Sequence, residues 1–144
     1  MNNKYLIIGG DSKLGKHLSI YLQKKNFFFL KTSRRNKNNS LYLDLKNPKE
    51  FKIPNKINYC FFLAGITDYE KCEKKRLSKI INVNNTAFLI KKLINKGIHV
   101  NFISSNTVFG GATTKTNEND EKNPKFAYAK HKSYCEDKLL RCFK

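Results

Sequence analysis

The sequence has few residues that would cross-link the chain or bind a metal. Its 144 residues include no tryptophan, one methionine, three prolines and four cysteines. The cysteines have no CxxC spacing and no histidine cluster near them, which argues against a tetrahedral metal site. We therefore expect no bound metal and free thiols at Cys60, Cys72, Cys135 and Cys142, with Cys60 in a buried strand.

Long hydrophobic runs and a secretory leader are also missing. The longest apolar runs, FFFL at 27–30 and CFFLAGI at 60–66, are far shorter than the roughly 20 residues that a membrane helix needs. The first run, YLIIGG, is short and leads directly into a structured pattern, unlike a signal peptide. The sequence predicts one cytoplasmic domain, residues 1–144, with no membrane partner.

Acidic residues are scarce, because 11 Asp and Glu oppose 29 Lys and Arg for a formal charge of +18. Such an excess attracts the phosphate backbone of nucleic acids. The lysines are scattered along the whole chain among asparagines, and no zinc-finger or RNA-binding motif accompanies them. We expect no specific nucleic-acid partner and keep non-specific nucleic-acid binding as one alternative function.

Apolar strands and helical patterns alternate along the chain. KYLIIGG, a helical pattern at 14–25 and FFFLKT form a βαβ unit. Further strands are expected at 41–45, 59–65 and 99–105, and a long helix at 79–97 should end at Gly97. A surface loop follows, and Asn123 and Pro124 predict the N-cap and first residue of a helix reaching about Cys142. The pattern predicts an α/β fold with a doubly wound, Rossmann-type parallel sheet.

The turn after the first strand, GGDSKLG, contains Gly9, Gly10 and Gly15. Glycines let a backbone turn tightly and approach a pyrophosphate, whose charge is stabilised by the free N–H groups at a helix N-terminus. Because this turn follows a strand and opens a helix within a βαβ unit, it predicts a dinucleotide site.

The second predicted strand ends in KTSRR, where an NAD site would carry a carboxylate for the ribose 2′-hydroxyl. This segment has no carboxylate and several cations, and arginine presents a planar fork that matches phosphate. Arg34 and Arg35 therefore favour NADP(H), with NAD as the alternative.

Several motifs together resemble the N-terminal half of an extended short-chain dehydrogenase/reductase, closest to the branch of dTDP-4-dehydrorhamnose reductase-like sugar-nucleotide reductases. LIIGGDSKLG is similar to the family's nucleotide turn, LYLDL to its third strand, FFLAG to its fourth strand, INVNNT to its asparagine segment and ISSNTVFGG to its serine loop. FAYAKHK supplies its Tyr-x-x-x-Lys pair. The cofactor-binding residues that the resemblance implies are Gly9, Ser12, Lys13, Leu14, Gly15, Arg34, Arg35, Asp44, Leu63, Ala64, Gly65, Asn82 and Lys132.

The catalytic residues implied by the resemblance are Ser105, Tyr128 and Lys132. Positions four apart lie on one face of a helix, so Tyr128 and Lys132 can reach one ligand. An ammonium beside a phenol favours the phenolate and would lower the pKa of Tyr128. Ser105 can donate a hydrogen bond to the substrate oxygen. We expect His17 and His131 to face solvent and His99 to pack beside its strand.

The resemblance implies an NADP(H)-dependent oxidoreductase acting on a nucleotide sugar, or the cofactor-binding half of one. Family members continue for roughly as many residues again, with the region that selects the sugar. A catalytically silent dinucleotide-binding or interaction module is the alternative. The expected partners are a nucleotide-sugar substrate and a homodimer formed through the helix near Ile80–Ile94 and the Tyr128 helix, or a separately encoded C-terminal half.

Two positions depart from the family's pattern. Ser12 replaces the central glycine of the nucleotide turn, and Asn85 replaces the glycine of the asparagine segment. A Cβ at Ser12 stands where backbone would approach the pyrophosphate, which predicts a tighter or slightly displaced site.

Overall fold

The computed structural model describes residues 3–35, 39–110 and 116–142. They form two compact units. The first contains Met1–Gly65 and Phe88–Ile103, and the second contains Ile66–Ala87 and Ser104–Lys144.

The first unit is built on a five-stranded parallel sheet of order β3-β2-β1-β4-β5. Leu6, Ile7 and Ile8 of the central strand are wholly buried, as expected for a strand covered on both faces. This topology confirms the predicted Rossmann-type sheet. The strands are β1 (Lys4–Ile8), β2 (Phe28–Ser33), β3 (Leu41–Tyr42), β4 (Tyr59–Phe62) and β5 (His99–Phe102).

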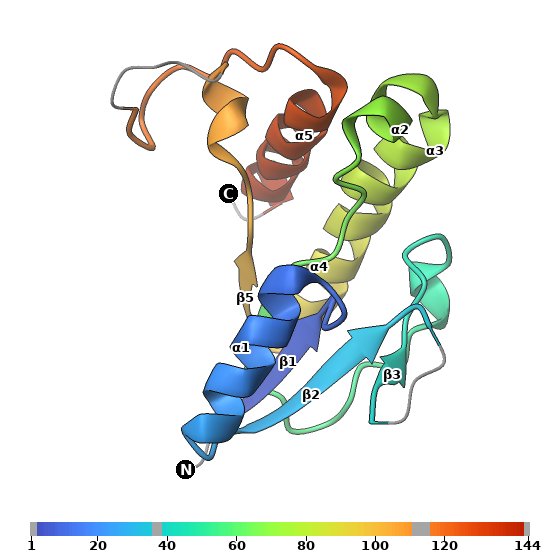
Figure 1. The fold of residues 1–144 in the computed structure, drawn as a ribbon, viewed down its shortest axis with the longest axis vertical. Coiled ribbons are helices and arrows are strands. Elements are labelled where there is room, and N and C mark those ends of the chain that lie inside the picture. Colours follow the sequence, from blue (N-terminus) through green and yellow to red (C-terminus); the bar gives the residue numbers. More distant parts are fainter. Residues whose placement is uncertain (1–2, 36–38, 111–115, 143–144) are drawn as a thin grey trace. The chain divides into compact units, whose positions relative to one another are not determined.

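Two helices connect the strands of this sheet. Helix α1 (Lys13–Lys24) joins β1 to β2 and packs on both of them (Figure 1). Helix α4 (Thr86–Ile94) precedes β5 and buries Leu89 and Leu93 completely. Because β2 and β5 lie on opposite sides of the β1–β4 pair, right-handed crossovers place α1 and α4 on opposite faces of the sheet.

The second unit is helical. It contains α2 (Tyr69–Lys74), α3 (Arg76–Lys79), a π-helical segment (Ile80–Asn85), a 3₁₀ turn (Asn106–Phe109) and α5 (Ala127–Cys142). Helix α5 packs against α2 and against the π-helical segment, as the red and green helices of Figure 1 show.

Some of the observed elements differ from the expected ones, and one helix was not expected. The strand predicted at 41–45 pairs only at Leu41–Tyr42, after which the chain enters a turn and the 3₁₀ helix Pro48–Glu50. The helix predicted at 79–97 is interrupted by the π-helical segment. Helix α2 did not appear in the sequence pattern at all, because its six residues are too few to show a helical period.

The predicted cap of α5 is wrong. The helix begins at Ala127, and the N–H of Asn123 instead donates to the carbonyl of Val108 over 2.9 Å. The first amide of α5, that of Ala127, donates to Glu73 Oε1 over 2.7 Å. A carboxylate from α2 therefore replaces the local cap, which no local sequence pattern could indicate.

Among the described residues, no helix has both the length and the apolar character needed to cross a bilayer.

Candidate functional site

The turn after β1 is anchored to β2. The N–H of Gly9 donates to Thr32 Oγ1 over 3.1 Å, and the N–H of Gly10 donates to the carbonyl of Thr32 over 3.0 Å. Gly9 has a φ of +91°, and a Cβ there would stand 2.8 Å from the backbone nitrogen of Ala64. Both the backbone conformation and the close approach to the end of β4 therefore require glycine at this position.

Ser12 closes the same turn and caps α1. Its Oγ donates to the carbonyl of Gly9 over 2.8 Å and accepts the N–H of Gly15 over 3.0 Å. A Cβ on Gly15 would lie 2.4 Å from that carbonyl oxygen, so only glycine fits here. Ser12 therefore tightens the turn from within. Lys13 and Leu14 supply the first two amides of α1, which have no acceptor within the helix and are available to an anion.

The end of β2 carries cations together with a carboxylate that the sequence analysis did not place there. Arg34 and Arg35 are exposed, whereas Ser33 is buried. Ser33 Oγ donates to Asp11 Oδ2 and accepts the N–H of Arg35 over 2.9 Å. The segment KTSRR has no acid of its own, but the glycine turn brings Asp11 to it.

The remaining predicted cofactor residues of the first unit follow β3 and β4. Asp44 Oδ1 accepts the N–H of Lys46 over 2.9 Å and so shapes the turn after β3. The N–H of Leu63 donates to the carbonyl of Ile8 over 2.8 Å, which continues the pairing of β4 with β1. Gly65 is exposed.

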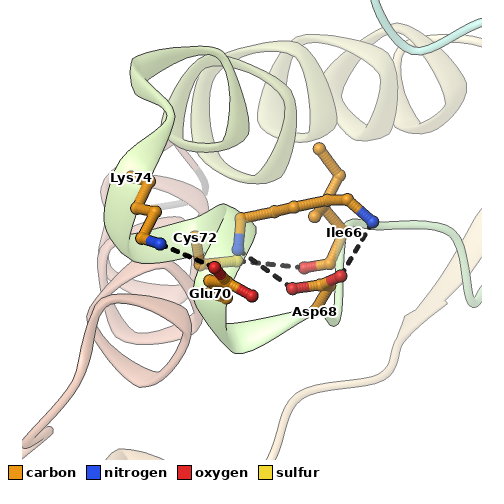
Figure 2. Close-up of polar contacts among 6 residues, drawn as sticks. Ile66, Asp68, Glu70, Cys72 and Lys74 are labelled. Atoms are coloured by element: carbon orange, nitrogen blue, oxygen red, sulfur yellow. Dashed lines mark hydrogen bonds and ion pairs between the residues drawn. The ribbon is translucent and has the colours of Figure 1, made fainter.

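Asn82, the predicted cofactor residue on the π-helical segment, binds the loop that follows β4. Its Oδ1 accepts the N–H of Ile66 over 2.8 Å, and its Nδ2 donates to the carbonyl of Ile66 over 2.9 Å. The thiol of Cys72 donates to the same carbonyl over 3.4 Å, and Asp68 caps the start of α2 (Figure 2). Both ends of the Asn82 amide thus fix this loop.

Ser105 begins the 3₁₀ turn that follows Ser104. Its Oγ lies 2.8 Å from Thr107 Oγ1 and accepts the N–H of Thr107 over 3.3 Å. Sequence reasoning missed Thr107, although the spacing Ser-x-Thr within ISSNTVFGG places two hydroxyls on one turn. The neighbouring Ser104 Oγ donates to Glu136 Oε1 on α5. That contact ties the serine turn to the helix that carries Tyr128.

Tyr128 and Lys132 lie together on α5, with Lys132 Nζ 6.0 Å from the centroid of the Tyr128 ring. The pKa of Tyr128 is raised, chiefly by burial and also by the neighbouring Tyr69 and Cys72. Burial lowers the pKa of Lys132. The expectation that Lys132 depresses the Tyr128 pKa in the protein alone is therefore wrong, because desolvation outweighs the distant ammonium.

Tyr69 is a second aromatic neighbour that sequence reasoning missed. Its ring centroid lies 5.5 Å from that of Tyr128 and 4.8 Å from that of Phe126. Tyr69 is more than half exposed, at 55%. Tyr69 begins α2, far from α5 in the sequence, so the sequence pattern around it gives no sign of its contact with Tyr128.

Glu136 joins three parts of the second unit. Besides accepting from Ser104, it pairs through Oε2 with Lys122 Nζ over 2.8 Å, and Lys122 also reaches Asp137 Oδ1 over 2.7 Å. The loop before α5 is thereby held to the helix one turn beyond Lys132.

The histidines and thiols differ in burial. The prediction that His131 faces solvent is wrong, because it is only 5% exposed. His17 is exposed, as expected, and His99 makes an edge contact with Tyr59 at 5.7 Å between ring centroids.

Cys60, Cys72 and Cys135 are buried free thiols, and burial raises the pKa of Cys60 to about 12 and that of Cys135 to about 11. The side chain of Cys142 lies outside the described residues.

A group of three or more His, Cys, Asp or Glu side chains that could hold a metal ion is not found in the part of the chain that the structure describes.

The features of the first unit fit a dinucleotide. Two glycines whose Cβ atoms would clash shape the turn, the helix amides of Lys13 and Leu14 follow it, and a pair of arginines stands at the end of the neighbouring strand. The predicted residues Asn82, Ser105, Tyr128 and Lys132 belong to the second unit.

A five-stranded parallel sheet of order 3-2-1-4-5 with a glycine turn between β1 and α1 defines a Rossmann-like α/β protein. Residues 3–143 match the family model described as the RmlD substrate binding domain. The chain belongs to that family.

Solved structures share the fold of this chain. The dTDP-4-dehydrorhamnose reductase of Clostridium acetobutylicum is 28% identical with a TM-score of 0.78, and the match covers 96% of this chain and 49% of that one. The Bacillus anthracis reductase, in complex with NADP, is 21% identical with a TM-score of 0.81, and the match covers 98% and 50%.

A third structure, MoeE5 in complex with UDP-glucose and NAD, is 22% identical with a TM-score of 0.81, over 96% of this chain and 48% of that one. The matches at 21% and 22% identity show the fold alone. The chain spans about half the length of these proteins. No curated protein sequence matched the chain.

Proposed function

We propose that residues 1–144 act as one NAD(P)-binding domain, and that the protein is an NADP(H)-dependent oxidoreductase of the nucleotide-sugar type or the cofactor-binding half of one. The observation that carries the proposal is the turn from Gly9 to Gly15, where added Cβ atoms would collide with backbone and where α1 begins. Such a turn lets a pyrophosphate approach the helix amides.

The choice of NADP(H) rests on the two arginines after β2. Arg34 and Arg35 are exposed, and Arg35 is fixed at its backbone N–H by Ser33. A guanidinium pairs with a phosphate through two parallel hydrogen bonds, which the 2′-hydroxyl of NAD cannot match. Among the related structures, the Bacillus anthracis reductase is a complex with NADP and MoeE5 is a complex with NAD.

The other predicted residues have distinct roles in this proposal. The side chain of Asp44 contacts the adenine, and Leu63, Ala64 and Gly65 line the cofactor. Asn82 holds the loop at Ile66 in place. Lys132 binds the nicotinamide ribose.

Three side chains would carry the chemistry. When bound, a nicotinamide cofactor supplies hydride acceptance or donation. Ser105 donates a hydrogen bond to the substrate oxygen, and Tyr128 exchanges a proton with that oxygen. Lys132 provides a positive charge on the same helix face as Tyr128, and that charge favours the phenolate form of the phenol.

The direct test is a titration of the purified chain with NADPH and, separately, NADH, followed by nicotinamide fluorescence. The variant Arg34→Ala, Arg35→Ala should weaken NADPH binding at least about tenfold and leave NADH binding within about threefold. The matched control, Lys24→Ala with Lys25→Ala, removes two exposed cations from the other end of α1 and should leave both affinities unchanged. A folded chain that binds neither dinucleotide would contradict the proposal.

A second function, a catalytically silent dinucleotide-binding or interaction module, is favoured by the raised pKa of Tyr128. A half-buried phenol with a raised pKa exchanges its proton poorly near neutral pH. The two functions differ in their response to Tyr128→Phe. An oxidoreductase loses reduction of a keto-sugar nucleotide and keeps dinucleotide binding, whereas a silent module shows no reduction in either form.

The proposed partners are a nucleotide sugar and a second copy of the chain, with a separately encoded C-terminal half as the alternative to the second copy. Leu77, Ile80 and Tyr134 of the second unit are exposed apolar side chains on or beside the helices expected to dimerise. Sedimentation velocity tests the dimer, and Ile80→Glu should shift the chain to monomer. A wild-type chain that sediments as a monomer at all concentrations would contradict it.

A further inference from the structure

The carboxylate of Asp11 lies at the end of β2, in hydrogen-bond contact with Ser33. Ser33 Oγ donates to Asp11 Oδ2 and accepts the N–H of Arg35 over 2.9 Å. Ser33 itself is 3% exposed. One buried hydroxyl thus joins an acid from the glycine turn to the backbone of Arg35.

The backbone on both sides of Asp11 is fixed. Gly10 donates its N–H to the carbonyl of Thr32 over 3.0 Å, and Ser12 is bonded to Gly9 and Gly15 as the cap of α1. Asp11 itself is partly exposed. Its carboxylate is therefore held beside the end of β2.

Opposite charges consequently stand at the position that distinguishes the two dinucleotides. In a site of this topology, a carboxylate at the end of the second strand binds the ribose 2′-hydroxyl, whereas arginine there accommodates a 2′-phosphate. A carboxylate accepts a hydrogen bond from the hydroxyl but repels the phosphate, which carries up to two negative charges.

We propose that Asp11 is a specificity-determining residue that opposes Arg34 and Arg35, favouring NAD(H) and weakening the preference for NADP(H). This inference rests on the proposed function, because it concerns the same dinucleotide site. It assigns part of the discrimination between NAD(H) and NADP(H) to a turn residue 22 positions before Ser33. The composition of KTSRR does not reveal this residue.

The substitution Asp11→Asn tests the charge alone. Asparagine keeps an oxygen that accepts from Ser33, so the turn is retained while the negative charge is lost. Dissociation constants for NADPH and NADH are measured by nicotinamide fluorescence at low salt and at about 0.5 M salt. The ratio Kd(NADH)/Kd(NADPH) should rise at least about tenfold in Asp11→Asn at low salt, and by less at high salt, because ions screen a partly exposed charge.

Two further variants serve as a control and as a comparison of opposite sign. Glu50→Gln removes an exposed carboxylate from the same unit, outside the glycine turn and the end of β2, and should leave the ratio within twofold of the wild type. Arg34→Ala with Arg35→Ala should move the ratio in the opposite direction, toward NADH.

An unchanged ratio in a folded Asp11→Asn chain that still binds dinucleotide would overturn the role of Asp11 and leave the proposed function intact. A wild-type chain that binds neither dinucleotide would overturn both. If Asp11→Asn does not fold, Asp11→Ser, which keeps a hydrogen-bonding oxygen on the turn, carries the same expectation. Failure of both variants to fold would show that Asp11 supports the turn and does not select the cofactor.

Discussion

The imidazole of His131 is buried on α5 with one nitrogen lacking a partner. Its Nδ1 makes no hydrogen bond within the described residues, and the side chain is 5% exposed. Burial, together with the positive charge of Lys79, lowers its pKa below the usual 6.5, against the opposing effect of Glu73. A buried polar atom without a partner reduces stability, since it has lost its water without compensation.

Replacing His131 with leucine should therefore stabilise the protein. We expect the free energy of unfolding at pH 7 to rise by about 1 kcal/mol, the typical cost of one unsatisfied buried group. Urea denaturation followed by circular dichroism measures the change. A decrease of that size would instead show that the ring makes packing contacts that leucine does not replace.

The same residue should make stability depend on pH. Because the pKa of His131 is lower in the folded state than in the unfolded state, the unfolded state binds more protons as the pH falls below about 6.5. Stability is therefore full above that pH and declines below it, by at most about 1.4 kcal/mol per pH unit for one proton. His131→Leu should lose this part of the slope between pH 7 and 5, and equal slopes in both proteins would contradict the assignment.

The N-terminus of α5 depends on a carboxylate from another helix. Glu73 on α2 accepts the N–H of Ala127 over 2.7 Å, at the end of the helix where the dipole is positive. Two helices distant in sequence are thus joined at the helix that carries Tyr128.

Truncation of Glu73 to alanine should cost about 1 kcal/mol of stability, as loss of a cap usually does. Glu70→Ala is the matched control on the same helix, because Glu70 forms an exposed ion pair with Lys74 (Figure 2), and its loss should cost less than about 0.5 kcal/mol. Thermal or urea unfolding compares the two. Equal losses would mean that the contact with Ala127 contributes nothing specific.

Glycine is required at two helix ends for different reasons. At Gly15 a Cβ would lie 2.4 Å from the carbonyl oxygen of Gly9, whereas Gly97 has a φ of +75° and open space around it. Gly15→Ala should lose about 2–3 kcal/mol by overpacking, and Gly97→Ala about 1 kcal/mol by backbone strain. Only Gly15→Ala should also abolish dinucleotide binding, and calorimetry measures both effects. Normal binding by Gly15→Ala would contradict the role of this turn.

At the scale of the whole molecule, the fold was largely predictable because its signals are local. Apolar runs marked β1 and β4, and Gly97 marked the end of the helical region before β5. Several of the features that were missed are contacts between distant residues. Asp11 meets Ser33 across 22 positions and Glu73 meets Ala127 across 54, so the pattern around each residue shows nothing of the contact.

The net charge of +18 gives the molecule one further property. Scattered lysines should bind duplex DNA at low salt without regard to its sequence, through release of counterions. Fluorescence anisotropy should show affinity falling at least about a hundredfold between roughly 20 and 200 mM salt, equally for unrelated duplexes. Binding that persists at the higher salt for one sequence would indicate a specific nucleic-acid site.

The buried thiols can report separately on the opening of each unit. Cys60 lies in the sheet of the first unit, while Cys72 and Cys135 lie in the helices of the second. A thiol reagent attacks the thiolate, so each of these cysteines reacts only when the structure around it opens. Cys142 is first changed to serine. The labelling rate of Cys60 then measures how often the first unit opens, and the labelling rates of Cys72 and Cys135 measure how often the second unit opens. A ligand held by the glycine turn would then be expected to slow the first of these rates.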